Sequence, residues 1–188
     1  MLGTKVWVDA KLHDIPKTAA KRAAVITLLH DARIVTVHAS GGVPMMRAVV
    51  DCLNTSCGPV PSVWAVTVLT SLDPREIARI YGADRTPKQI VLDFAFMAKE
   101  AGVQGIICSP QEVGMLSKHP DLQGLKLVTP GVRSTGANIG DQKRIGTPKQ
   151  AIDDGASFIV VGSQVTEAKD PVAAFNAIAT EIDPTNMN

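Results

Sequence analysis

Residues 9–18 read DAKLHDIPKT, and they follow directly on the short apolar strand pattern of residues 6–8. The two acids and the lysine have D-x-K-x-x-D spacing, and Pro16 ends the extended segment. Side chains two apart on a strand share a face, so Asp9 and Lys11 are expected to project the same way, with Asp14 beyond the strand end. Taken alone, this spacing is more often a solvated strand end with an ordinary ion pair. The other interpretation is a functional site, and the rest of the chain has to decide between the two.

Strand and helix patterns alternate along the rest of the chain. Apolar, β-branched runs predict further strands at residues 34–38, 63–69, 105–108, 126–129 and 157–161. Helical patterns are found at residues 17–29, capped near Thr18, and at residues 44–53, 87–101, 111–117, 148–154 and 171–182. Continuous apolar strands indicate burial on both faces, which is typical of a parallel sheet covered by helices. The sequence therefore predicts an α/β protein.

Two α/β architectures fit this alternation. A doubly wound sheet usually has a glycine-rich phosphate loop after its first strand, and residues 9–18 contain no glycine. A (β/α)8 TIM barrel instead builds its site from polar residues at the ends of several strands, and here such strand-end residues are Asp9, Lys11, His38, Ser40, Thr70, Ser109, Thr129, Arg133, Gly162 and Ser163. About six strands are recognisable, where a closed barrel has eight. We predict a single partial TIM-barrel domain over residues 1–188.

The composition excludes several classes of protein. The chain has 188 residues, of which 45% are apolar, and 19 basic residues balance 18 acidic ones without a basic run. This composition gives no electrostatic signal for nucleic acid or for an anionic membrane. The three cysteines are an odd number without C-x-x-C spacing, so neither a disulfide framework nor a zinc site is indicated. No signal peptide is recognisable, and we expect a cytoplasmic protein.

Other polar residues give weaker signals. His38 ends a predicted strand but has no second histidine at metal-ligand spacing, so a hydrogen-bonded structural histidine is favoured. The glycine pair that follows it can cradle an anion or form a tight turn, and the turn is favoured. Cys108 is expected to be a buried, inert thiol. The polar loop of residues 129–144 lies where barrel enzymes commonly hold a phosphate, which favours Arg133, Gln142 and the backbone at Gly162 as its ligands.

Six segments together resemble one family, orotidine 5′-phosphate decarboxylase in its bacterial form. The segments are DAKLHDIP at residues 9–16 with Thr18, VHASGG at 37–42, VTVLTS at 66–71, CSPQE at 108–112, VTPGVR at 128–133, and GDQKR at 140–144 with TP at 147–148. Related sugar-phosphate decarboxylases share D-x-K-x-x-D, but HASGG and GDQ-x-R resemble the nucleotide enzyme specifically. Because six motifs match in order and spacing, they favour this family over the interpretation of the D-x-K-x-x-D spacing as a solvated ion pair.

The resemblance implies decarboxylation of orotidylate to UMP, without a cofactor or metal, on a homodimeric barrel. It implies that Lys11 donates a proton to the carbon that loses CO2 and that Asp9 sits against the departing carboxylate. Asp14 would reach across the dimer interface into the neighbouring site. The family positions that bind the nucleotide match Thr18, Thr70, Arg133, Gln142, Gly162 and Ser163. Alternating acids and lysines would keep a cation fixed where negative charge develops.

Two departures from the family pattern bear on activity. The family has two further β-α units before the D-x-K-x-x-D strand, which supply an aspartate for the ribose and another lysine, whereas here the resemblance starts at residue 3. We therefore expect a truncated chain, a gene fragment or a misplaced start codon, with a gap of about 10 Å in the barrel wall. The family's last strand ends in Gly-Arg-Pro, whereas this chain has Ser163 after Gly162. Lys143, Arg144 and Lys169 are the candidates to replace the missing arginine.

Two alternative functions stay open. One is a non-catalytic relative that dimerises or binds a nucleotide weakly, which Ser163 and the missing lysine favour. The other is a sugar-phosphate lyase with a bound Mg²⁺, which the shared D-x-K-x-x-D spacing permits.

Overall fold

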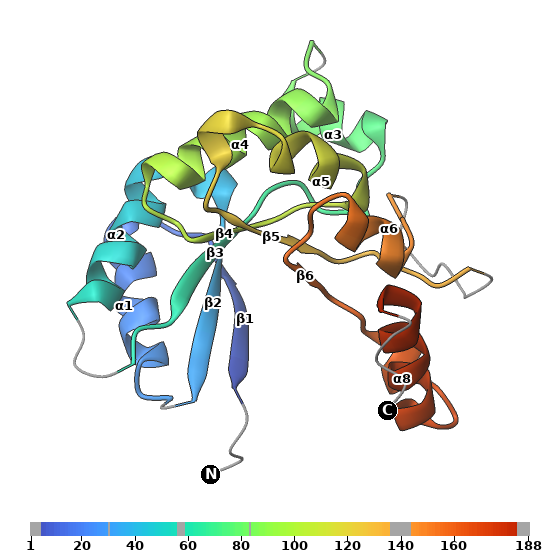
Figure 1. Cartoon of the computed structure of the whole chain (residues 1–188). Helices are drawn as coiled ribbons and strands as arrows, with labels where there is room; N and C mark the ends of the chain where they lie inside the picture. Colours follow the sequence, from blue (N-terminus) through green and yellow to red (C-terminus); the bar gives the residue numbers. More distant parts are fainter. Residues whose placement is uncertain (1–4, 30, 56–58, 83, 136–143, 184–188) are drawn as a thin grey trace. The chain divides into compact units, whose positions relative to one another are not determined.

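The computed structural model describes residues 5–29, 31–55, 59–82, 84–135 and 144–183. Contacts between Cα atoms divide the chain into two compact units. The first unit comprises residues 1–67 and 89–107, and the second comprises residues 68–88 and 108–188. Six strands lie in the described residues, four in the first unit and two in the second (Figure 1).

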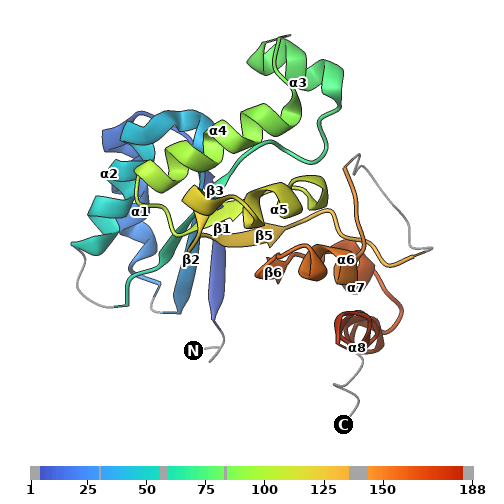
Figure 2. The ribbon, with the colours of Figure 1, turned by 45° about the horizontal axis from the view of Figure 1, so that its top comes forward.

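The first unit is a parallel sheet with strand order β1-β2-β3-β4. Its strands are β1 (Val6–Leu12), β2 (Ala32–His38), β3 (Ser62–Val66) and β4 (Gly105–Ile107). Its helices are α1 (Pro16–Ile26), α2 (Gly42–Asn54), which follows the short helix η1 (Ala39–Gly41), and most of α4 (Pro87–Glu100). Helices α1 and α2 pack side by side on one face of this sheet (Figures 1 and 2).

Burial differs between the strands of this sheet. Val35 and Val37 of β2 are fully buried, as are most residues of β3, in agreement with the continuous apolar runs. Val6, Trp7 and Val8 of β1 are only half-buried, although Leu12 at its end is buried, so the expectation of burial on both faces is wrong for most of this strand. The physical reason is its position, because β1 comes first in the strand order and pairs with β2 alone among the described strands of this unit.

The second unit pairs β5 (Lys126–Thr129) with β6 (Phe158–Ile159) in parallel. Its helices are α3 (Pro74–Tyr81), α5 (Pro110–Ser117), η2 (Pro120–Leu122), α6 (Pro148–Asp153), α7 (Ser163–Thr166) and α8 (Pro171–Ile182). Helix α8 packs against α6 and α7, and the Ser117 hydroxyl of α5 donates to the Asp154 carbonyl after α6 at 2.7 Å. No helix in the described part of the chain is long and apolar enough to cross a bilayer.

The sequence patterns located most of these elements. The predicted strand at 126–129 and helix at 171–182 have the observed bounds, whereas the strand predicted at 63–69 ends at residue 66. Helix α3 was missed, although its signal is present: Asp73 accepts from two backbone N–H groups at 2.9 Å, and the Glu76 carboxylate accepts from the Asp73 N–H at 2.8 Å. The first helix begins at Pro16 after Ile15, so the cap predicted near Thr18 is wrong.

Candidate active site

The D-x-K motif lies in a bulge of β1. Val8 pairs with Val35 of β2 and Leu12 pairs with Val37, so three residues of β1, Asp9 to Lys11, face the single residue Thr36. The Lys11 backbone has φ 45°, and Lys11 is the one non-glycine residue with positive φ that we find in the described residues. A left-handed conformation is unfavourable for a lysine, and such strain concentrates at functional sites. The bulge therefore redirects the side chains of a strand that would otherwise alternate regularly.

Thr36 joins the two charged residues of this bulge. Its buried hydroxyl donates to Asp9 Oδ1 at 2.8 Å and accepts from the Lys11 backbone N–H at 2.8 Å. The Lys11 ammonium lies 2.5 Å from Asp9 Oδ2, with both side chains about half exposed. The structure thus brings Asp9 and Lys11 together as predicted, but through a bulge and a threonine rather than through regular strand alternation.

Asp14 and Thr18 lie just beyond β1. Asp14 Oδ1 accepts from the Ile15 N–H at 2.8 Å, and its Oδ2 lies 3.3 Å from Arg22 of α1. Thr18 lies half-buried in the first turn of α1, where its backbone N–H donates to the Ile15 carbonyl at 3.0 Å. Asp14 is therefore beyond the strand end, as predicted, and is held within this chain by the first turns of α1.

Two histidines lie beside the bulge. The His13 and His38 ring centroids are 5.6 Å apart, and Ser40 Oγ lies 3.5 Å from His13 Nε2. Burial lowers the pKa of His38, and His13 and Lys11 lower it further, whereas the Asp9 carboxylate raises it. His38 therefore favours its neutral form close to the lysine.

Arg133 and Ser163 meet in the second unit. Arg133 Nη2 donates to Ser163 Oγ at 3.4 Å, and Nη1 donates to the Val132 carbonyl at 2.8 Å. The neighbouring residues reinforce this contact, because Gln164 exchanges two hydrogen bonds with Ser134 at 3.2 and 2.9 Å. Ser163 begins α7 directly after Gly162, so these three predicted residues lie together. Gln142 was predicted to join them and lies outside the described residues.

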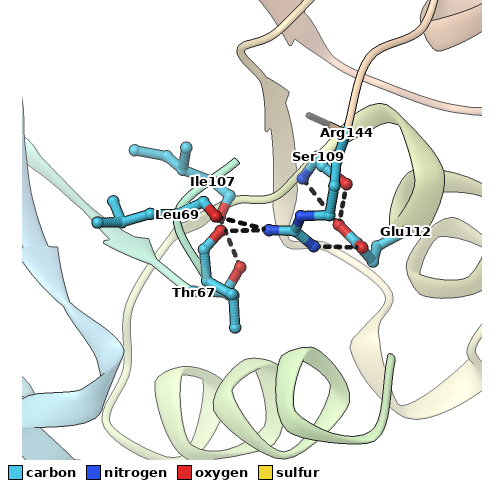
Figure 3. Close-up of polar contacts among 7 residues, drawn as sticks. Thr67, Leu69, Ile107, Ser109, Glu112 and Arg144 are labelled. Carbon is cyan, nitrogen blue, oxygen red and sulfur yellow. Dashed lines mark hydrogen bonds and ion pairs between the residues drawn. The ribbon is translucent and has the colours of Figure 1, made fainter. Parts of the chain in front are cut away.

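Arg144 and Glu112 form a buried ion pair in the same unit (Figure 3). Arg144 is 6% exposed, and its Nη1 lies 2.6 Å from Glu112 Oε1. Its Nη2 donates to the carbonyls of Val68 and Leu69 at 2.8 and 3.1 Å, just before Thr70. This engagement corrects the suggestion that Arg144 replaces a phosphate-binding arginine.

Cys108 is buried as predicted, and burial raises the pKa of its thiol well above the usual range, with the Glu112 carboxylate adding to the effect. Across the described ranges of the chain, no three His, Cys, Asp or Glu side chains are grouped so that they can hold a metal ion.

Sequence reasoning missed Thr36 as well as the pairing of Arg144 with Glu112. Thr36 lies inside an apolar strand run, where a threonine is unremarkable, and only the pairing of β1 with β2 shows its partners. Arg144 and Glu112 are 32 residues apart in the sequence, so no local pattern links them.

Parallel strands, β-α connections and charged side chains at strand ends are features that this α/β chain shares with (β/α) barrels. Residues 2–178 match the model of the Orotidine 5′-phosphate decarboxylase / HUMPS family. The chain is 44% identical to the orotidine 5′-phosphate decarboxylase of Pseudoalteromonas translucida over 97% of its own length and 76% of that protein. It is 43% identical to the orotidine 5′-phosphate decarboxylase of Pseudomonas aeruginosa over 96% of its own length and 76% of that protein.

A solved structure leads to the same assignment. The crystal structure of orotidine 5′-phosphate decarboxylase from Lactobacillus acidophilus matches with a TM-score of 0.80 at 38% identity, covering 96% of this chain and 76% of that one. The chain therefore belongs to the orotidine 5′-phosphate decarboxylase family. The predicted fold class, a (β/α)8 TIM-barrel type with about six β-α units present, is confirmed. That the chain forms a single domain stays a prediction.

Proposed function

We propose that this chain is a carboxy-lyase that converts orotidylate into UMP and CO2, with Lys11 as the proton donor. The observation that carries the proposal is the strained Lys11 backbone at φ 45°, held by Thr36 beside the Asp9 carboxylate. A lysine in this conformation has a cost that a purely structural position would avoid with glycine or asparagine. The strain therefore supports a role for the ammonium itself.

The proposed chemistry needs only one proton transfer from the protein. The bond between C6 of the pyrimidine and the carboxylate carbon breaks, CO2 leaves, and the electron pair stays on C6. The Lys11 ammonium then gives its proton to C6, and the resulting amine takes a proton back from water. A fixed cation beside C6 stabilises the negative charge as it develops, and Asp9 holds that cation in place.

The remaining site residues are proposed to bind the nucleotide. Thr18, Thr70, Arg133, Gln142, Gly162 and Ser163 match the family's binding positions, and the contact of Arg133 with Ser163 supports a common site for the phosphate. The active form is proposed to be a homodimer in which Asp14 acts across the interface, with no metal or cofactor. Its location is proposed to be the cytoplasm.

A second candidate is a relative that binds the nucleotide without turning it over. Ser163 favours it, because a serine hydroxyl at the start of α7 gives the phosphate a neutral contact where an arginine would give a charged one. A charge-assisted hydrogen bond contributes about 1.5–3 kcal/mol, or roughly ten- to a hundred-fold in affinity. Part of that binding energy can also lower the chemical barrier.

Turnover of orotidylate followed by UV absorbance separates these candidates. The purified chain is expected to convert orotidylate, Lys11→Ala to lose turnover while still binding UMP by calorimetry, and Lys21→Ala, an exposed lysine on α1, to match the parent. UMP binding without turnover by the parent would favour the second candidate. Turnover abolished by EDTA would favour the Mg²⁺-dependent sugar-phosphate class, and normal activity in Lys11→Ala would refute the assigned role.

A further inference from the structure

The buried pair of Arg144 and Glu112 connects three segments of the second unit. Arg144 follows β5, Glu112 lies in the first turn of α5 after β4, and the Val68 and Leu69 carbonyls follow β3. Glu112 uses its other oxygen, Oε2, to accept from the Ser109 N–H at 3.0 Å and from the Ser109 hydroxyl. One guanidinium and one carboxylate thus tie together the chain segments that leave three strands (Figure 3).

Stability alone is a weak explanation for this pair. Glu112 is 2% exposed and Arg144 is 6% exposed, so both charges have lost their water. Replacing a buried ion pair with apolar residues of similar size is often neutral or stabilising, because desolvation offsets the attraction. A planar guanidinium, however, fixes the direction of several acceptors at once, which apolar packing does not do.

The acceptors of Arg144 include the carbonyl of the peptide that leads into Thr70. The Leu69 carbonyl belongs to the planar peptide that ends in the Thr70 nitrogen, so a hydrogen bond to that carbonyl restricts the orientation of the whole peptide. Leu69 is 40% exposed, so apolar burial holds this segment only partly. The guanidinium adds a charged donor to the Leu69 carbonyl, which also accepts from the Leu72 N–H at 3.2 Å.

We propose that Arg144 is a positioning residue that sets Thr70 for nucleotide binding, with Glu112 holding the guanidinium in place. The inference rests on the proposed function, because Thr70 acts there as a binding residue. Arg144 itself does not contact the nucleotide in this scheme. Its effect passes through the Val68 and Leu69 carbonyls and is therefore an effect on substrate affinity rather than on the chemical step.

A double-mutant cycle on UMP affinity, measured by calorimetry, tests the inference. Arg144→Lys keeps a positive charge for Glu112 but cannot span two carbonyls and a carboxylate, so UMP affinity is expected to fall about tenfold. Thr70→Ala is expected to have a similar effect, and the double variant to stay near tenfold rather than reach a hundredfold. Arg47→Lys is the matched control, since the exposed Arg47 also binds a carbonyl and a carboxylate, both of Glu100, and it should leave affinity unchanged.

A second variant separates positioning from stability. Glu112→Gln leaves the guanidinium next to the two carbonyls but removes the balancing charge, so it should lower thermal stability more than Arg144→Lys while weakening UMP binding less. The inference would be overturned if UMP affinity fell in parallel with thermal stability in both variants. A hundredfold loss of UMP affinity in the double variant of Arg144→Lys and Thr70→Ala would also overturn it. Turnover of orotidylate by the parent tests the proposed function separately. If the parent binds UMP without turning over orotidylate, the proposed function is refuted, and the double-mutant cycle on UMP affinity can still be measured.

Discussion

Replacing Thr36 with valine removes one hydroxyl and keeps the shape of the side chain. That hydroxyl is the only atom in the described structure that we find bonded both to the Asp9 carboxylate and to the Lys11 backbone N–H, each at 2.8 Å. Without it, Lys11 has lost the hydrogen bond that supports its left-handed backbone. Thr36→Val is therefore expected to destabilise the bulge and to release the ammonium from its position.

The magnitude follows from the two hydrogen bonds. A bond to a charged group contributes about 1.5–3 kcal/mol, but Asp9 is half exposed, so we take about 1 kcal/mol for it. The backbone bond adds about 1 kcal/mol. The free energy of unfolding should thus fall by about 2 kcal/mol, or about 4–8 °C in Tm for a chain of this length. A displaced proton donor should also reduce kcat by about tenfold or more, since a shift of about 1 Å is sufficient.

The assay for this variant combines unfolding with turnover. Trp7 and Trp64 are the only two tryptophans of the chain, and both lie in the first unit, so urea unfolding followed by tryptophan fluorescence reports on the unit that contains the bulge. Thr36→Ser is the matched control because it keeps the hydroxyl and loses a methyl group, at a cost of about 1 kcal/mol. It should retain turnover within about threefold of the parent. Equal turnover by the valine and serine variants would refute the role given to the hydroxyl.

Three further outcomes are expected. Ser163→Arg should bind UMP about tenfold more tightly, with uridine binding unchanged in the same calorimetric titration, because it adds a cation where a phosphate is proposed to sit. Burial lowers the pKa of His38 below its usual 6.5, so the unfolded state binds more protons than the native state, and stability should fall as pH drops below about 6.5. His38→Asn should flatten that slope in urea titrations at a series of pH values. Gly105→Ala should lose about 1–3 kcal/mol in urea unfolding, because a Cβ there would lie 2.5 Å from Trp64 Cδ1.

Patterns that act over a few residues predicted most of the fold. The helix at 171–182 and the strand at 126–129 were located from apolar spacing alone, because burial imposes that spacing directly. Helix α3 was missed because only Ile77 of its eight residues is buried, so the apolar signal is weak. Its Asp-Pro start, with Glu76 three residues after Asp73, was the signal that could have located it.

The candidate site was predictable in its residue types but not in its geometry. Asp9 and Lys11 stood out as opposite charges after an apolar strand, but only the resemblance of six segments to one family favoured a site over a solvated ion pair. The bulge that presents them could not be predicted, since strand alternation gives no sign of where extra residues are inserted. Thr36 and Arg144 depend on partners that are distant in the sequence, and only the folded chain brings those partners together.

The strain at Lys11 can be separated from its charge by two substitutions. Lys11→Ala and Lys11→Gly remove the same ammonium and the same ion pair with Asp9, so they differ only in the backbone at φ 45°. In an ordinary strand, glycine is less stable than alanine by about 0.5–1 kcal/mol. In the left-handed region alanine keeps a strain of about 1–2 kcal/mol that glycine lacks, so the order should reverse and Lys11→Gly should be the more stable variant by about 0.5–1 kcal/mol. Urea unfolding monitored by tryptophan fluorescence measures the difference, and a more stable alanine variant would show that the bulge does not hold Lys11 in a strained conformation. Neither variant should turn over orotidylate. If Lys11→Gly is more stable than Lys11→Ala, a side chain at this position lowers stability, and the lysine is present for a reason other than stability.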